Sequence, residues 1–266
     1  MLDQLQIIVN LLETAQRAAR HELVKLGAQY AESASWLFED SGNLNAARQW
    51  NVRAMEWAHE SGDRRMLSWS LFRRSQQAMA SGNAAEVIGL AQAAGRPGDE
   101  LPPPIRAAIT QQEAQGYALD RDESTAQHKL DDALQWAATE TSGDARDGHG
   151  SFCTATYIEL QRATCFMTMR KPKEAIRLFE ANIPCLPAVY HRDRGVALAH
   201  LAAGYAADDE PQRASQAGSA ALAIARSAGS ERILSSVASV GRSLMQHEKV
   251  PGVRPFLHEL SLDGTP

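Results

Sequence analysis

Amide, aromatic and basic side chains recur at helical spacing along the middle of the sequence. Gln112 and Gln115 lie one helical turn apart, as do Arg73 and Gln76. Amides can pair with both the N–H and the C=O groups of a peptide, and aromatic rings add contact area. We therefore predict a concave groove that binds a peptide, a small metabolite or a protein segment. The predicted groove residues are Trp36, Trp69, Arg73, Gln76, Gln112, Gln115, Tyr157, Gln161, Arg194 and His200.

The same residue types have a plainer interpretation. Glutamines and arginines on a helix usually form a solvated face, and aromatic rings at these positions can simply stack neighbouring helices. A second polar set is expected nearer to the interfaces between helical hairpins, where some members would form buried ion pairs because an unpaired buried charge is costly. This second set is Arg74, Glu113, Glu159, Arg162 and Arg194.

The common catalytic and nucleotide-binding motifs are missing from the sequence. It contains no G-x-x-x-x-G-K-[ST], G-x-S-x-G, G-x-G-x-x-G or H-E-x-x-H. The three cysteines have no C-x-x-C spacing, and the glycine-rich segment 143–150 lacks the terminal glutamate of a calcium loop. We therefore predict no catalytic residues, no metal site and no cofactor. The alternative is an enzyme that uses a polar cluster of Tyr157, Arg194 and His200.

Composition and charge narrow the function classes further. The 266 residues are 44% hydrophobic, and 27 Lys and Arg stand against 32 Asp and Glu, for a formal net charge of -5. An acidic chain without a basic stripe is poorly suited to neutralising a phosphate backbone. No stretch approaches the roughly 18 apolar residues that a membrane helix needs, and the first residues lack the features of a signal peptide. We expect a cytoplasmic protein that contacts neither membrane nor nucleic acid directly.

A helical pattern repeats five times along the chain. Each copy has a two-residue polar turn, a small or apolar residue about five positions later and, in most copies, another small residue seven positions after that. Short side chains let two antiparallel helices approach closely, and alanine favours helices. The pattern predicts an all-α fold, a right-handed α-solenoid of about five helical hairpins. The turns are Gly42-Asn43, Gly82-Asn83, Arg121-Asp122, Arg170-Lys171 and Asp209-Glu210.

This pattern resembles the tetratricopeptide repeat, whose consensus has small residues, an aromatic residue and a Gly-Asp or Gly-Asn turn. The consensus Trp is absent, and the spacing exceeds the usual period of about 34 residues. We predict one solenoid domain over residues 1–266. Its parts are an N-terminal capping helix at 1–25, five hairpins at 26–229 and C-terminal capping helices at 230–262.

Several phrases resemble the C-terminal tetratricopeptide region of actinobacterial helix-turn-helix regulators of the Xre/Cro type. In that family the repeats follow a DNA-binding helix-turn-helix. The resemblance implies that the repeats sense a ligand or partner and mediate self-association. Residues 1–25 are too few to supply such a module, so the chain is either a fragment or a free-standing relative. The phrases are SWLFEDSGN (35–43), LFRRSQQA (71–78), QQEAQG (111–116), YIELQRA (157–163) and RDRG (192–195).

The leading functional prediction is a non-enzymatic binding module, the sensing and self-association part of a transcriptional regulator. Occupancy of the groove would change the shape of the solenoid or its dimer contacts. The rival prediction is a constitutive scaffold or homodimerisation module without a small ligand. Its candidate surfaces are the apolar face of residues 1–25, with Ile7, Ile8 and Leu11, and the tail 250–257.

Overall fold

The computed structural model describes residues 2–96, 100–138 and 148–262. Within these ranges the chain forms thirteen α-helices and three short 3-10 helices, without any strand, so the predicted all-α class is confirmed. The elements are α1 (Leu2–Thr14), α2 (Arg17–Asp40), α3 (Leu44–Glu60), α4 (Arg64–Ala78), η1 (Met79–Ser81), α5 (Ala84–Gly95), α6 (Pro103–Leu119), α7 (Glu123–Gln135), α8 (Ala155–Thr168), α9 (Pro172–Asn182), η4 (Ile183–Cys185), α10 (His191–Ala207), α11 (Pro211–Ala228), α12 (Glu231–Leu244), η5 (Met245–His247) and α13 (Val253–Ser261).

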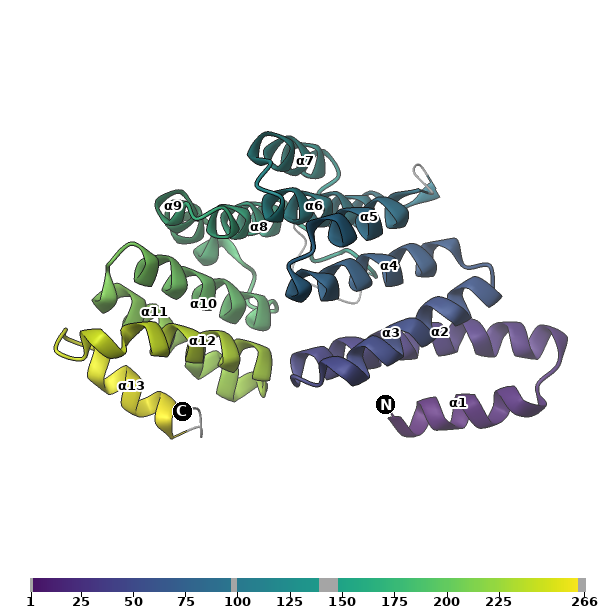
Figure 1. Cartoon of the computed structure of the whole chain (residues 1–266). Helices are drawn as coiled ribbons and strands as arrows, with labels where there is room; N and C mark the ends of the chain where they lie inside the picture. Colours follow the sequence, from purple (N-terminus) through teal and green to yellow (C-terminus); the bar gives the residue numbers. More distant parts are fainter. Residues whose placement is uncertain (1, 97–99, 139–147, 263–266) are drawn as a thin grey trace.

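Five antiparallel helical hairpins follow one another along an arch (Figure 1), namely α2–α3, α4–α5, α6–α7, α8–α9 and α10–α11. Each hairpin reverses at its predicted turn, where one residue adopts the left-handed conformation that ends a helix. The five hairpins of the predicted solenoid are thereby confirmed. The turn residues and their φ angles are Gly42 (79°), Gly82 (68°), Arg121 (62°), Arg170 (60°) and Asp209 (59°).

The small residues of the repeat lie where the two helices of a hairpin meet. Ala47 and Ala54 of α3 are fully buried, and so are Ala126 and Ala133 of α7. A methyl group at these positions leaves room for the backbone of the partner helix, which a larger side chain would displace. The repeat pattern therefore encodes the close approach of the helices directly.

The chain ends follow the prediction less closely. The single helix predicted over residues 1–25 is instead α1, a turn at residues 15–16, and the first turns of α2. Leu5 and Ile8 are buried as α1 folds back on α2, and no Gly or Pro marks the turn between them. Tertiary packing therefore decides this boundary. At the other end, α12 and α13 are separated around Pro251, as predicted.

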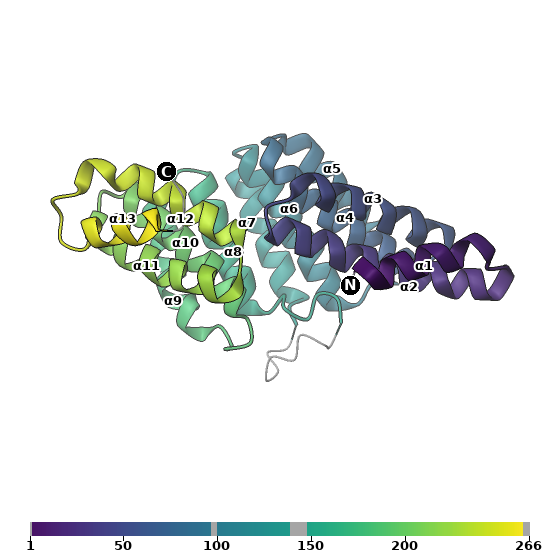
Figure 2. The same ribbon diagram turned by 90° about the horizontal axis from the view of Figure 1, so that it is seen from below.

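Two hydrophobic clusters form the core, and α8 contributes to both. Ile158 and Cys165 belong to the N-terminal cluster, whereas Leu160 and Ala163 belong to the C-terminal one. Figure 2 shows α1–α5 and α9–α13 on opposite sides of the molecule, with α7 and α8 between them. The two halves are thus joined through apolar packing at α8.

The first helix of each hairpin lies on the inner side of the arch. In this inner row, α2 packs on α4, α4 on α6, α6 on α8, and α8 on α10. The row continues to α12, which contacts α2 and so brings the two ends of the arch together (Figure 1). Among the helices of the described residues, none is long and apolar enough to cross a membrane.

Candidate functional site

The inner row of helices encloses a cavity of about 270 Å³, which we call the inner cavity. Every inner helix from α2 to α12 contributes at least one side chain to it. Its lining residues are Glu39, Gln76, Met79, Gln112, Gln115, Tyr157, Leu160, Gln161, Thr164, Phe179, Asp193, Val196, Ala197, His200, Arg232 and Ser236.

Two glutamines of α6 stand out among these residues. Gln112 and Gln115 share a helix face because they are three positions apart, and they are only 3% and 4% exposed. Gln115 Nε2 donates to Gln161 Oε1 at 2.8 Å. By contrast, Gln112 Nε2 and Gln115 Oε1 have no hydrogen-bond partner among the described residues. A buried donor and a buried acceptor without partners are unfavourable, unless an occupant of the cavity pairs with them.

Burial also changes the acid–base behaviour of the lining. Removal of His200 from water lowers its pKa to about 4, and the positive charge of Arg232 acts in the same direction. The ring is therefore neutral at pH 7, and its Nδ1 lies 3.3 Å from Thr164 Oγ1. Burial raises the pKa of both Tyr157 and Asp193. The cavity thus favours neutral hydrogen-bonding groups over free charges.

Six of the ten predicted groove residues line the inner cavity. They come from four different helices, so the fold brings together side chains that lie up to one half of the sequence apart. The six are Gln76, Gln112, Gln115, Tyr157, Gln161 and His200.

Two predicted groove residues, Arg73 and Trp69, lie behind the cavity wall. Arg73 is 6% exposed and donates to Glu39 Oε2 at 2.9 Å and to Gln76, and its Nε lies 3.5 Å from Glu32. A buried guanidinium needs such partners, which leaves it unavailable to a ligand. Trp69 is buried and packs 4.7 Å from Phe72, measured between ring centres. Both side chains therefore serve the core.

The other two, Trp36 and Arg194, lie away from the inner cavity. The Trp36 ring lies 5.5 Å below the guanidinium of Arg192, near the place where the ends of the arch meet. Arg194 Nη2 donates to the backbone oxygen of Leu186 at 2.5 Å and thereby holds the segment that precedes α10. Neither side chain lines the cavity.

Ion pairs between helices appear at three members of the second polar set, of which Arg74 of α4 lies 3.7 Å from Glu86 of α5. Glu113 of α6 is buried and lies 2.9 Å from Lys129 of α7, also accepting a hydrogen bond from Gln92. Arg162 of α8 reaches Asp131 of α7 at 2.7 Å and so links two successive hairpins. Glu113 and Arg162 are mostly buried, whereas Asp131 is 66% exposed. That these pairs fix the register of the repeats stays a prediction.

Arg232, Ser236 and Asp193 line the cavity but were not predicted from the sequence. The first two belong to α12, a helix assigned to the C-terminal cap and therefore placed far from the groove. They reach the cavity because the arch closes on itself, and no spacing in the sequence signals that closure. Asp193 is adjacent to the predicted Arg194, but the helix turns Asp193 inward instead.

A second cavity lies on one open side of the inner cavity, and we call it the mouth. Its volume is about 480 Å³, and four side chains line both spaces. The mouth is bordered by the turn between α2 and α3, by the end of α4 and by the start of α12. The shared residues are Glu39, Gln76, Arg232 and Ser236.

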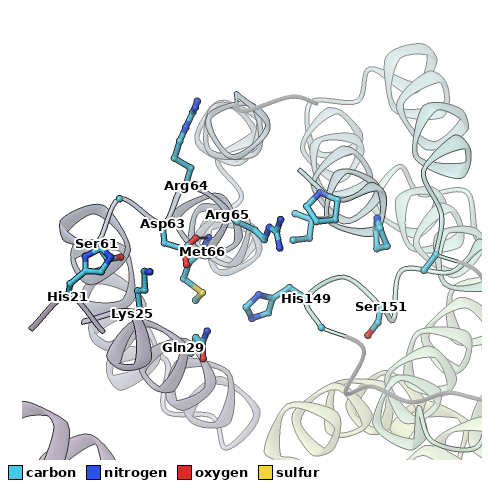
Figure 3. A pocket seen from close by; sticks show the side chains of 16 residues that line it. His21, Lys25, Gln29, Ser61, Asp63, Arg64, Arg65, Met66, His149 and Ser151 are labelled. Atoms are coloured by element: carbon cyan, nitrogen blue, oxygen red, sulfur yellow. Dashed lines mark hydrogen bonds between the residues drawn. The ribbon is translucent and has the colours of Figure 1, made fainter. Parts of the chain in front are cut away.

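A larger cavity of about 840 Å³ is lined by the N-terminal parts of α2, α4 and α6, and is called the outer cavity (Figure 3). Four of its polar side chains, those of Lys25, Ser61, Asp63 and Arg64, have partners. Arg64 pairs with Glu100 at 2.8 Å, and Asp63 caps α4 by accepting from the Met66 backbone N–H at 2.9 Å. His149 stacks on Trp69 with ring centres 4.8 Å apart. Part of the glycine-rich segment discussed above, 143–147, lies outside the described residues.

Comparison with known proteins gives structural likeness alone. No protein-family profile matches the chain, and no curated protein matches it. A solved structure of a Rap protein complexed with competence and sporulation factor is similar, with a TM-score of 0.63 and 13% identity over 98% of this chain and 81% of that chain. The tetratricopeptide domain of P58(IPK) aligns with a TM-score of 0.33, also at 13% identity, over 97% and 72% of the two chains. The likeness to the Rap structure shows a shared fold, here an α-solenoid of helical hairpins.

Proposed function

We propose that this chain is a non-enzymatic binding module that holds an extended segment of peptide or protein in its inner cavity. The observation that carries the proposal is the pair of buried amides, Gln112 and Gln115, which line the cavity with an unpaired donor and an unpaired acceptor. An extended backbone presents C=O and N–H groups in alternation, so it satisfies both amides at once.

The shape of the site supports an elongated occupant over a compact metabolite. The inner cavity alone, about 270 Å³, is small for a ligand site, for which about 300 to 1,000 Å³ is usual. The adjoining mouth shares four lining side chains with it and lengthens the site we propose into a path. A segment that lies along this path leaves its ends in solvent. A small metabolite would fill only the inner part.

The proposal includes a regulatory role, in which binding in the inner cavity is detected by a partner. The likeness of the sequence to the repeat region of Xre/Cro-type regulators supports a sensing role in transcriptional control. The similar Rap structure, which contains competence and sporulation factor, supports a bound occupant on this fold. An occupant that contacts helices from both halves of the arch alters their relative position, which is the change that a partner can detect.

The test is selection of binders from a display library of random linear decapeptides. Binding of an enriched, fluorescein-labelled peptide is then measured by anisotropy with the parent and with Gln115→Leu. We expect Gln115→Leu to weaken binding by about tenfold, the equivalent of one lost hydrogen bond to a buried group. The matched control is Gln111→Leu, because Gln111 is also buried on α6 but does not line the cavity. Equal affinity for all three proteins contradicts the proposal.

A scaffold function through self-association is the second candidate, favoured by the exposed apolar side chains of α1. Ile7 and Leu11 are 57% and 48% exposed and lie one turn apart, on a helix whose other face packs on α2. A second copy of the chain would bury them. The double substitution Ile7→Glu and Leu11→Glu should then convert a dimer into a monomer in light scattering. An unchanged mass removes this candidate.

A further inference from the structure

A buried carboxylate joins the two ends of the arch. Asp40, the last residue of α2, is 4% exposed. It accepts hydrogen bonds from Ser230 Oγ at 2.8 Å and from Arg192 Nε at 3.1 Å, and Arg232 Nε lies 3.5 Å away. Its partners therefore lie more than 150 positions further along the chain. This cluster of four side chains is called the latch.

Each partner in the latch comes from the start of a C-terminal helix. Arg192 lies in the first turn of α10, and Ser230 is the N-cap of α12. The backbone fits closely as well, because a Cβ added at Gly42 would lie 3.2 Å from the Glu231 side chain. The turn between α2 and α3 is thus seated against the start of α12, and the arch is closed into a ring.

The latch differs in kind from the other junction between the two halves. At α8 the two hydrophobic clusters are joined through one continuous helix, whereas the latch is built from polar groups. The side chains of Arg192 and Arg232 remain 40% and 36% exposed. The Asp40 side chain is 6% exposed in both pairs. Its desolvation offsets much of the attraction between the charges, and water returns to all three groups when they separate. The ring therefore opens at the latch more readily than at α8.

The latch also borders the proposed binding site. Arg232 lines both the inner cavity and the mouth while its Nε faces Asp40. A carbonyl or carboxylate oxygen of an occupant that pairs with Arg232 competes with Asp40 for the same guanidinium. Occupancy and closure are then linked through one side chain.

We propose that the cluster of Asp40, Arg192, Ser230 and Arg232 is a latch that gates the inner cavity. This inference rests on the proposed function for the identity of the occupant. In the closed ring only a chain end can enter through the mouth. With the latch open, an internal segment of a protein can be laid against the inner helices from the side.

The test uses cysteine reactivity and needs no ligand. Thr164, which lines the inner cavity, is changed to Cys in a Cys185→Ser background, and labelling by a polyethylene-glycol maleimide is timed. Cys153 and Cys165 are buried, and burial raises the pKa of each thiol, so they do not compete. We expect Asp40→Asn to speed labelling by about tenfold as the open population rises. The matched control is Asp208→Asn at the C-terminal end of α10, where the pair with Lys173 spans 3.9 Å.

A second variant covers the case in which Asp40→Asn does not fold. Arg192→Gln removes one partner and leaves Asp40 with Ser230 and Arg232, and it should also speed labelling. Unchanged labelling in a folded variant overturns the latch. If labelling accelerates but the selected peptides do not depend on Gln115, the latch stands and the proposed function fails. If the peptides bind as proposed and labelling is unchanged, the latch alone fails.

Discussion

The inner and outer cavities differ in whether their polar side chains have hydrogen-bond or ion-pair partners. The outer cavity is about three times larger, at about 840 Å³ against about 270 Å³, yet its Lys25 and Arg64 form ion pairs and its Asp63 caps a helix. The inner cavity is smaller, but its buried Gln112 and Gln115 each keep an amide atom without a partner among the described residues. Unsatisfied amide atoms that line a cavity, more than the volume of the cavity, therefore indicate where an occupant belongs.

The wall of the inner cavity shows a different case, a buried charge that is held by two carboxylates and an amide. Arg73 is held by Glu32, Glu39 and Gln76 directly behind the lining. This network joins α4 to α2, and α4 packs on α6, the helix that carries the two amides. Paired charges thus build the site, and unsatisfied groups in front of them are left for binding.

The largest effect is expected from Arg73→Ala. The substitution leaves Glu32 and Glu39 as buried carboxylates without their cation, so the free energy of unfolding should fall by about 3 to 5 kcal/mol. At the outer cavity, Arg64→Ala removes an exposed pair and should cost less than about 1 kcal/mol. Urea unfolding measures both. Similar losses for the two variants would break the comparison between the cavities.

A smaller, pH-dependent effect is expected from His200. Its pKa is about 4 in the folded protein against 6.5 for the free side chain, so unfolding takes up a proton at intermediate pH. The contribution of the neutral ring is complete above pH 6.5 and is lost as the pH falls towards 4, by up to about 3 kcal/mol. His200→Gln should flatten the stability curve between pH 6.5 and 4. A curve that keeps its full slope contradicts the burial of this ring in the inner cavity.

The smallest expected effect is an increase in the free energy of unfolding. Gln112→Met replaces an unpaired buried amide with an apolar side chain of similar size, and should raise the free energy of unfolding by about 1 kcal/mol. Gln29→Met, on the exposed rim of the outer cavity, should change it by less than about 0.5 kcal/mol. Differential scanning calorimetry compares the two. A loss of stability in Gln112→Met would show that the amide is structural.

The sequence predicts the repeat well because each of its signals is local. Turn residues such as Gly42 and Arg121, and small residues such as Ala47 and Ala54, act within one hairpin, so spacing alone locates them. The turn at residues 15–16 has no such signal. It exists because α1 gains burial against α2, which is a tertiary effect.

The candidate site is predicted in part for the same reason. Gln112 and Gln115 follow from helical periodicity, which places them on the inner face. The spacing does not distinguish a residue on the inner face from one just behind it, which is why Arg73 and Trp69 were predicted together with the lining. Arg232 depends on closure of the ring between Asp40 and α12, a contact across 192 positions that no local pattern encodes.

Native mass spectrometry of the protein, gently purified from its own host, tests the central claim most directly. The account predicts an additional mass, retained by the parent and by Gln29→Met and absent from Gln112→Met. Such a result assigns the occupant to the inner cavity and identifies it by its mass. An additional mass that persists unchanged in Gln112→Met, or a protein that carries none in any form, contradicts the account.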